Sequence, residues 1–166
     1  MSARYEDATR IRRLVRRAAA TKPGSWVFAR VAHRLDRIVY RRTGGRSTAA
    51  SWVAGLPVVM VTTTGARSGR KATTPILGVP EGGGIVVIGS NFGQAHHPAW
   101  VHNLRADPRA YVRVVGGPEH DAVAEEVTGA ERERLIALAS EVYPGFPQYV
   151  KRAAPRRIRV IRLIPS

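Results

Sequence analysis

A short basic turn is the segment whose residue types point most directly to ligand binding. Residues 65–71, with the sequence GARSGRK, follow an apolar, strand-like run. Their two glycines allow a tight turn in which backbone N–H groups and the side chains of Arg67, Arg70 and Lys71 face outward together, and such a turn can bind an anion. Basic turns are also common on protein surfaces without any ligand, so this simpler interpretation stays open for the segment taken alone.

Residues 89–93, GSNFG, follow another apolar run and form a second candidate site. The hydroxyl of Ser90 can donate a hydrogen bond to a carbonyl or a ring nitrogen. Gly89 and Gly93 allow a flat ring to approach the backbone closely. An ordinary exit from a strand into a loop needs no function, so this segment alone is a weak signal.

An indole and three histidines follow within residues 96–102, HHPAWVH. Trp100 offers either a wall for a planar ring or a plain core anchor. His97 and His102 are five residues apart, which does not give the i, i+4 pair of a helical zinc site, and no cysteine or carboxylate follows at ligand spacing. No metal site is expected here.

Three aromatic residues recur at intervals of three in residues 143–149, YPGFPQY. Pro144 and Pro147 prevent a continuous helix, so a rigid turn that opens into a short helix at Pro147 is expected. The phenols of Tyr143 and Tyr149 can supply a proton at the mouth of a pocket. The alternative is a hydrophobic staple that seals one end of the fold.

Six short runs predict the strands that must position these segments, at 58–64, 73–79, 84–90, 110–115, 121–128 and 157–164. Amphipathic spacing and breakers predict helices at 6–20, 25–43, 98–106 and 130–142, with Pro98 in the first helical position of the third. Short strands joined by tight turns, with helices inserted, indicate a small antiparallel barrel with α elements packed outside.

Composition and charge narrow the class of protein. The chain of 166 residues, 44% hydrophobic and without cysteine, suits one compact domain, with a basic helical segment at 1–50 and a barrel at 51–166. Its net charge of +15 lies mostly in the first fifty residues and attracts polyanions. No apolar run is long enough to span a membrane and no signal peptide is readable, so a cytoplasmic protein is expected.

The order of these segments resembles the deazaflavin-dependent nitroreductase family, which uses coenzyme F420. The resemblance covers the chain from about Arg37 to Tyr149. It is carried by YRRTGGR at 40–46, TTGARSG at 63–69, TTP at 73–75, GSN at 89–91, HPAWVHNLRADP at 97–108 and YPGFPQY at 143–149. Each piece is weak alone, but the ordered series is specific.

The resemblance implies an α+β fold, a small antiparallel split β-barrel with N-terminal helices and further helices outside. It implies an enzyme that transfers a hydride from the reduced deazaflavin to a quinone, a nitro compound or an activated alkene. The implied cofactor-binding residues are Arg67, Ser68, Arg70, Lys71, Thr74, Pro75, Gly89, Ser90, Asn91, Trp100 and Asn103. The implied acceptor-binding residues are Tyr143, Phe146 and Tyr149, and the implied catalytic residues are Tyr143, Tyr149 and Ser90.

Two departures from the family pattern bear on the acceptor and on cofactor binding. Phe146 stands where nitroimidazole-reducing members carry a tyrosine, which removes a phenol from the pocket. Ala66 and Ala72 stand where those members have basic residues, which leaves the cofactor's charge to Arg67, Arg70 and Lys71. FMN is the alternative cofactor on the same fold.

Two further interpretations come from other classes of protein. The first is a cofactor carrier without turnover. The second is a binder of anionic surfaces through the basic N-terminal helices. Residues 1–20 contain Tyr5 as their one aromatic residue, which argues against nucleic-acid stacking. A basic helix with an apolar stripe suits an anionic membrane better than a nucleic acid. If the protein binds anionic surfaces, we therefore expect peripheral attachment to the inner face of the membrane through residues 1–20.

Overall fold

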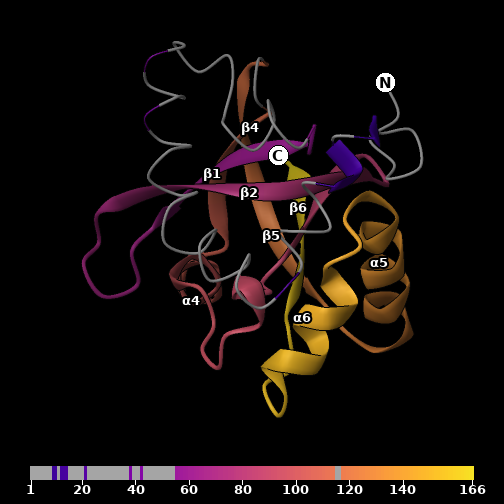
Figure 1. The fold of residues 1–166 in the computed structure, drawn as a ribbon. Coiled ribbons are helices and arrows are strands. Elements are labelled where there is room, and N and C mark those ends of the chain that lie inside the picture. Colours follow the sequence, from indigo (N-terminus) through magenta and orange to yellow (C-terminus); the bar gives the residue numbers. More distant parts are fainter. Residues whose placement is uncertain are drawn as a thin grey trace.

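The computed structural model of the protein describes residues 55–114 and 117–166, together with the isolated positions 9, 10, 12–14, 21, 38 and 42. Figure 1 shows a barrel of strands with helices beside it and across one end. The elements, in chain order, are β1 (Val58–Thr64), β2 (Lys71–Glu81), β3 (Gly84–Ile88), η1 (Asn91–Gly93), α4 (Ala99–Ala106), β4 (Arg109–Val114), β5 (Glu119–Val127), α5 (Gly129–Val142), α6 (Phe146–Ala153) and β6 (Val160–Pro165).

The six strands close into an antiparallel barrel in the order β1-β2-β3-β6-β5-β4. Alternating side chains of these strands fill the interior, because successive residues of a strand point to opposite faces. Val61, Val87 and Val112 are completely buried there. The expected fold class, an α+β protein built on a small antiparallel barrel, is confirmed.

Helix α4 closes one end of the barrel from within. Its residues Trp100, Val101 and Leu104 belong to the same buried cluster as the inward side chains of the strands. The helix was expected to pack outside the barrel. It packs into the open barrel end instead, because its three large apolar side chains lie within five residues and are buried together there. Pro98 is the N-cap with extended backbone, φ −65° and ψ 151°, rather than the first helical residue.

Helices α5 and α6 cover the outer face of the barrel, as expected. Val86 and Ile88 of β3 point outward and pack with Leu135 of α5 and Tyr149 of α6 in a second buried cluster. Figure 1 shows the two helices side by side next to β6. The two faces of the barrel wall thus bury two separate apolar cores.

Several boundaries differ from the sequence-based prediction. Strand β1 is as predicted, whereas β2 is longer by two residues at each end, because its paired hairpin continues up to the basic turn. Strand β6 begins at Val160 instead of residue 157, because Ile158 packs into the outer core before strand pairing begins. The helices expected at 6–20 and 25–43 lie outside the described residues apart from isolated positions, and the division at residue 50 stays a prediction.

Candidate functional site

The basic turn joins β1 to β2 and has a fixed backbone. Gly65 N–H donates to the carbonyl of Arg70 at 2.9 Å, and Gly69 N–H donates to the carbonyl of Gly65 at 2.8 Å. Gly69 has a φ of 64°, in the left-handed region that favours glycine. A Cβ at Gly65 would lie 2.5 Å from the Ser68 hydroxyl and 3.1 Å from the Arg70 carbonyl, so Ser68 would have to move to admit one.

Asn103 of helix α4 anchors this turn to the barrel. Its Oδ1 accepts a hydrogen bond from Ala66 N–H at 2.9 Å, and its Nδ2 donates to the hydroxyl of Thr63 at 2.9 Å. Thr63 is completely buried and the Asn103 side chain is buried beside it. One amide therefore joins the end helix, strand β1 and the basic turn.

The cationic side chains of the turn divide into two groups. The side chains of Arg67 and Arg70 are exposed, and neither guanidinium makes a hydrogen bond or ion pair with another described residue. Lys71 instead donates to the Thr64 hydroxyl at 3.1 Å, and its Nζ lies 4.9 Å from the centre of the Tyr111 ring. Lys71 is thus held on the outer face of β1 and β4, whereas the two arginines are available to an anion.

Strand β2 has a free edge beside the turn. It pairs with β3 only from Gly78 to Glu81, so among the described residues no strand pairs with that edge of residues 71–77. In an antiparallel ladder, pairs that are hydrogen-bonded alternate with pairs that are not. Gly65 and Arg70 form a hydrogen-bonded pair, so Thr73 and Pro75 belong to pairs with β1 that are not hydrogen-bonded. The backbone groups of Thr73 and the carbonyl of Pro75 therefore point to the free edge.

Residues 89–93 leave β3 where this free edge begins. Continuing the β2–β3 register places Ser90 at the level of Pro75. A side chain at Gly89 would lie 2.9 Å from Val101 and 3.9 Å from Trp100, so the glycine is required for close packing against α4. From the sequence, this glycine was attributed to the close approach of a ring, whereas the structure shows that it allows close packing against α4. Trp100 lies behind the Gly89 backbone and supports it.

Two residues of this loop are strained. Asn91 and Phe92 have φ values of 47° and 55°. Such a left-handed conformation in a residue other than glycine costs of order 1–3 kcal/mol and persists only where the surroundings impose it. The Asn91 amide donates to the carbonyl of His96 at 3.1 Å, which is one of these constraints.

Arg156 is the main constraint on this loop, and sequence reasoning missed it. Its guanidinium donates to the carbonyls of Gly89, Ser90 and Gln94 at 3.0, 2.7 and 2.9 Å. Its Nη1 also lies 3.2 Å from Nδ1 of His97. Burial first, and then the charge of Arg156, lower the pKa of His97 below its ordinary value. In a chain with 27 basic residues, nothing in the sequence marks this arginine.

The predicted aromatic residues come together on helix α6 and the turn before it. The hydroxyls of Tyr143 and Tyr149 lie 2.8 Å apart, and Phe146 packs edge-on against both rings. Burial is the main cause that raises the pKa of each phenol above its ordinary value. Both phenols therefore stay protonated near neutral pH, and both side chains are buried in the outer core.

Phe92 connects the loop at 89–93 to this aromatic cluster. Its ring lies 6.0 Å from that of Tyr149, in an edge-to-face arrangement. Above Gly93 a side chain would meet Tyr149 and Arg152 at 3.2 and 2.8 Å, so helix α6 packs directly on the loop. The loop that carries Ser90 and Asn91 thus packs on helix α6 through Phe92 and Gly93, while the basic turn lies at the far end of the free edge of β2.

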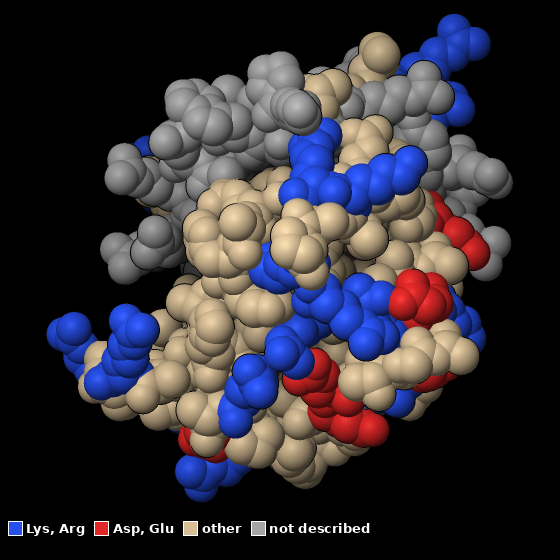
Figure 2. Space-filling view, turned by 90° about the horizontal axis from the view of Figure 1, so that it is seen from below, with Lys and Arg blue, Asp and Glu red and all other residues tan. Residues whose placement is uncertain are grey.

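The distance along that edge can be worked from strand geometry. From Pro75 to Arg70 is five residues, or roughly 16 Å at about 3.3 Å per residue. A long ligand with a planar, hydrogen-bonding head and an anionic tail fits this arrangement. Figure 2 shows Lys and Arg side chains spread over the end of the molecule seen from below, with fewer Asp and Glu side chains among them.

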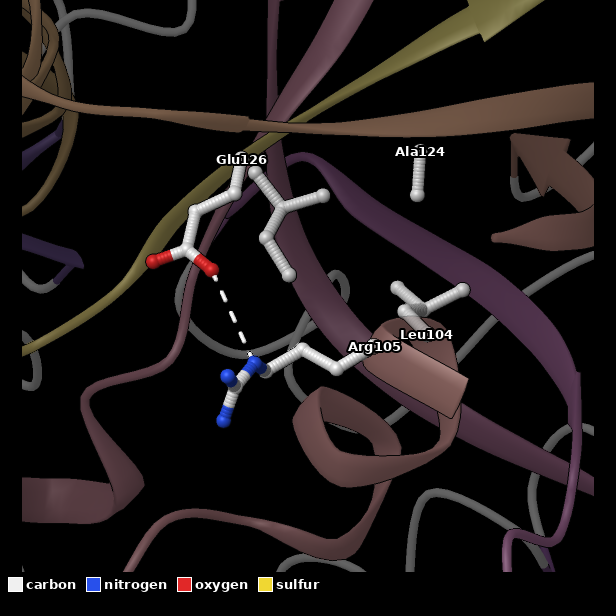
Figure 3. A pocket seen from close by; sticks show the side chains of 5 residues that line it. Leu104, Arg105, Ala124 and Glu126 are labelled. Carbon is white, nitrogen blue, oxygen red and sulfur yellow. Dashed lines mark ion pairs between the residues drawn. The ribbon is translucent and has the colours of Figure 1, made fainter. Parts of the chain in front are cut away.

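A shallow depression lies elsewhere on the barrel wall, where α4 faces β5 and β6. It has a volume of about 240 Å³ and is lined by Leu104, Arg105, Ala124, Glu126 and Ile161. In Figure 3, Arg105 and Glu126 point toward each other across it, with Nε and Oε2 3.9 Å apart. None of the predicted site residues lines this depression, so it is not the predicted groove.

The barrel fold agrees with comparisons to known proteins. The family described as F420H(2)-dependent quinone reductase matches residues 32–165. The chain belongs to this family. It is thus an oxidoreductase of a family that depends on coenzyme F420, as the resemblance implied.

Individual relatives support the assignment. An F420H(2)-dependent quinone reductase of Mycobacterium tuberculosis strain H37Rv is 32% identical over 119 residues, which are 71% of this chain and 68% of the relative. The solved structure of an F420-H2-dependent reductase, FDR-A, has a TM-score of 0.59 and 37% identity, and the match covers 64% of this chain and 93% of the other. A structure described as a domain-swapped dimer has a TM-score of 0.57 and 31% identity, covering 86% and 99% of the two chains.

Among the residues that the structure describes, no helix is both long and apolar enough to cross a membrane.

Proposed function

We propose that this chain reduces a quinone with the reduced form of coenzyme F420, bound along the free edge of β2. The observation that carries the proposal is this edge, where backbone groups of Thr73 and Pro75 pair with no other described strand and an exposed cationic turn lies at the end. Membership in the F420H(2)-dependent quinone reductase family supports it. Nitro compounds and activated alkenes remain predicted acceptors.

In this proposal the protein positions the cofactor and supplies charge. Arg67 and Arg70 bind the phosphate and the carboxylate tail, because exposed guanidinium groups form strong hydrogen bonds with both. The backbone of Thr73 and Pro75, with Ser90 opposite, binds the hydrogen-bonding edge of the ring. When bound, the reduced deazaflavin supplies the hydride, and the protein excludes water and fixes the geometry.

Two other predicted cofactor residues, Asn103 and Trp100, act from behind this surface. Asn103 holds the turn through Ala66 N–H, and Trp100 supports the backbone of Gly89. Lys71 is held by Thr64 and Tyr111, so we assign it a smaller share of the binding than the two arginines.

Reduction of a quinone to its hydroquinone requires a proton in addition to the hydride. The hydroxyls of Tyr143 and Tyr149 are the proposed source. They form one hydrogen-bonded pair, so when one phenol donates its proton, the second can hydrogen-bond to the oxygen that is left behind. Burial raises the pKa of both phenols, so each holds its proton near neutral pH and neither acts as a general base there.

Titration of the purified protein with F420, followed by fluorescence, tests the cofactor, with FMN in a parallel cell. Saturable binding of F420 alone, followed by oxidation of reduced F420 by menadione, is the expected result. Binding of FMN alone would keep the fold and replace the chemistry. Binding of F420 without turnover of any quinone would favour a cofactor carrier instead.

The anionic-membrane interpretation of residues 1–20 remains a separate proposal. Deletion of these residues should abolish pelleting with anionic liposomes and leave the affinity for F420 unchanged. Equal pelleting of the full and shortened chains would contradict it.

A further inference from the structure

Arg156 occupies a position between the two halves of the proposed site. It follows helix α6 directly, and its own backbone N–H donates to the carbonyl of Ala153 at 2.9 Å. Its side chain reaches back to the loop at 89–97, about sixty residues earlier in the chain. One residue therefore joins the helix that carries Tyr149 to the loop that carries Ser90.

The contacts of Arg156 use the shape of the guanidinium as well as its charge. Nε, Nη1 and Nη2 contact four acceptors, namely three carbonyls and the ring of His97. Arginine has no acceptor atom, so Nδ1 of His97 must accept this hydrogen bond and carries no proton. A lysine would keep the charge, but its single ammonium group cannot span acceptors arranged along a planar fork.

The loop that Arg156 holds would not keep its shape unaided. Asn91 and Phe92 are both in the left-handed region, and such residues are retained only where several contacts impose the conformation. Gly89 N–H donates to the carbonyl of Arg159 at 2.8 Å where the loop begins, and within the loop Gly93 N–H donates to the Ser90 carbonyl at 2.9 Å. Arg156 supplies the charge-assisted hydrogen bonds from outside the loop.

We propose that Arg156 is a positioning residue that fixes Gly89, Ser90 and Asn91 against helix α6, and so sets the separation between the cofactor edge and the tyrosine pair. The inference rests on the proposed function. It follows from the geometry because Phe92, inside the held loop, packs on Tyr149 at 6.0 Å. Release of the loop would move Ser90 and Tyr149 relative to each other.

The test compares Arg156→Lys with Arg157→Lys in the full chain. Arg157 is the matched control, because it is the adjacent arginine, is exposed and makes no hydrogen bond with another described residue. Three quantities are measured: amide hydrogen exchange of residues 89–97 without cofactor, the Kd for oxidised F420, and kcat and KM for menadione at saturating reduced F420.

For Arg156→Lys we expect exchange in residues 89–97 to accelerate and the Kd to rise, each about tenfold, as the loss of charge-assisted hydrogen bonds predicts. We also expect kcat to fall at saturating cofactor while the KM for menadione stays nearly constant, because a misplaced ring affects the reaction more than acceptor binding. Arg157→Lys should match the wild type in all three measurements.

His97→Leu provides a second, milder perturbation. It removes one of the four acceptors and should change the same quantities in the same direction by a smaller factor, so the inference can be tested even if Arg156→Lys does not fold. Wild-type exchange and wild-type Kd in both variants would overturn the inference. Faster exchange throughout the barrel, rather than in residues 89–97, would also overturn it, because Arg156 would then stabilise the whole fold.

Failure of the proposed function would look different. If the wild type binds no F420, the assigned cofactor is wrong, whereas the exchange experiment still decides whether Arg156 holds the loop. If the wild type binds and turns over F420 and Arg156→Lys does so equally well, only the positioning role is refuted.

Discussion

The anchoring of the basic turn by Asn103 can be tested by removing its buried partners in turn. Asn103→Leu keeps the size of the side chain but leaves the hydroxyl of the fully buried Thr63 without its donor. An unsatisfied buried polar group costs about 1–3 kcal/mol, and the lost bond to Ala66 N–H adds about 1 kcal/mol. We therefore expect the free energy of unfolding to fall by about 2–4 kcal/mol.

Thr63→Val added to Asn103→Leu should restore much of this loss. The double variant has no unpaired group at the buried contact, and replacing both partners of a buried hydrogen bond by apolar groups is nearly neutral. Ala66 is exposed, so water can replace the contact to its N–H. The double variant should therefore be about 1–3 kcal/mol more stable than Asn103→Leu alone. The coupling energy of the pair is the loss in the double variant minus the summed losses of the two single variants.

Urea denaturation followed by circular dichroism measures these differences for the wild type, the two single variants and the double variant. In thermal unfolding, a loss of about 3 kcal/mol corresponds to a Tm lower by roughly 6–12 °C for a domain of this size. If the losses of the two single variants simply add in the double variant, the two side chains are not coupled and the anchoring argument is wrong.

Three further predictions concern binding, turnover and pH. The double variant Arg67→Ala, Arg70→Ala should weaken F420 binding more than Lys71→Ala does, and the difference should be largest at low salt, where charges are least screened. A fluorescence titration at two salt concentrations measures this. An equal loss of affinity would contradict the distinction between the two exposed arginines and Lys71. Tyr143→Phe should lower turnover of menadione more than affinity for F420, and a change in affinity alone would assign this phenol to the cofactor. The hydrogen bond from Arg134, followed by that from Arg162, holds the pKa of Glu131 at about 2, below its ordinary value, so its contribution to stability is present above about pH 4.5 and is lost as the pH falls toward 2. Glu131→Gln should flatten the acid side of a plot of Tm against pH, and an unchanged slope would refute this assignment.

The sequence was sufficient to predict the parts of the fold that depend on local patterns. Strand β1 consists of valine, methionine and threonine and ends at the first glycine of the basic turn, so its bounds could be predicted. Strand β2 begins earlier than predicted because Lys71 and Ala72 have no strand propensity of their own. They are in the strand because Thr64 and Thr63 pair with them across the hairpin.

The long-range contacts of the site could not be predicted in the same way. Asn103 was selected through the family resemblance, but its hydrogen bond to Ala66 joins residues 37 positions apart. Arg156 was missed because its role depends on carbonyl groups that every residue possesses. A backbone acceptor leaves no trace in the side-chain pattern, so only the folded chain reveals which arginine it binds.

The proline in the free edge of β2 has a consequence for the solubility of the protein. An unpaired strand edge invites pairing with the edge of another chain, which leads to aggregation. Pro75 lies opposite Met60 in a pair without hydrogen bonds, so the position of its missing N–H faces the free edge. An incoming strand would find an acceptor there but no donor, and its ladder would be interrupted at the centre. Pro75 thus discourages association of this edge with a second polypeptide.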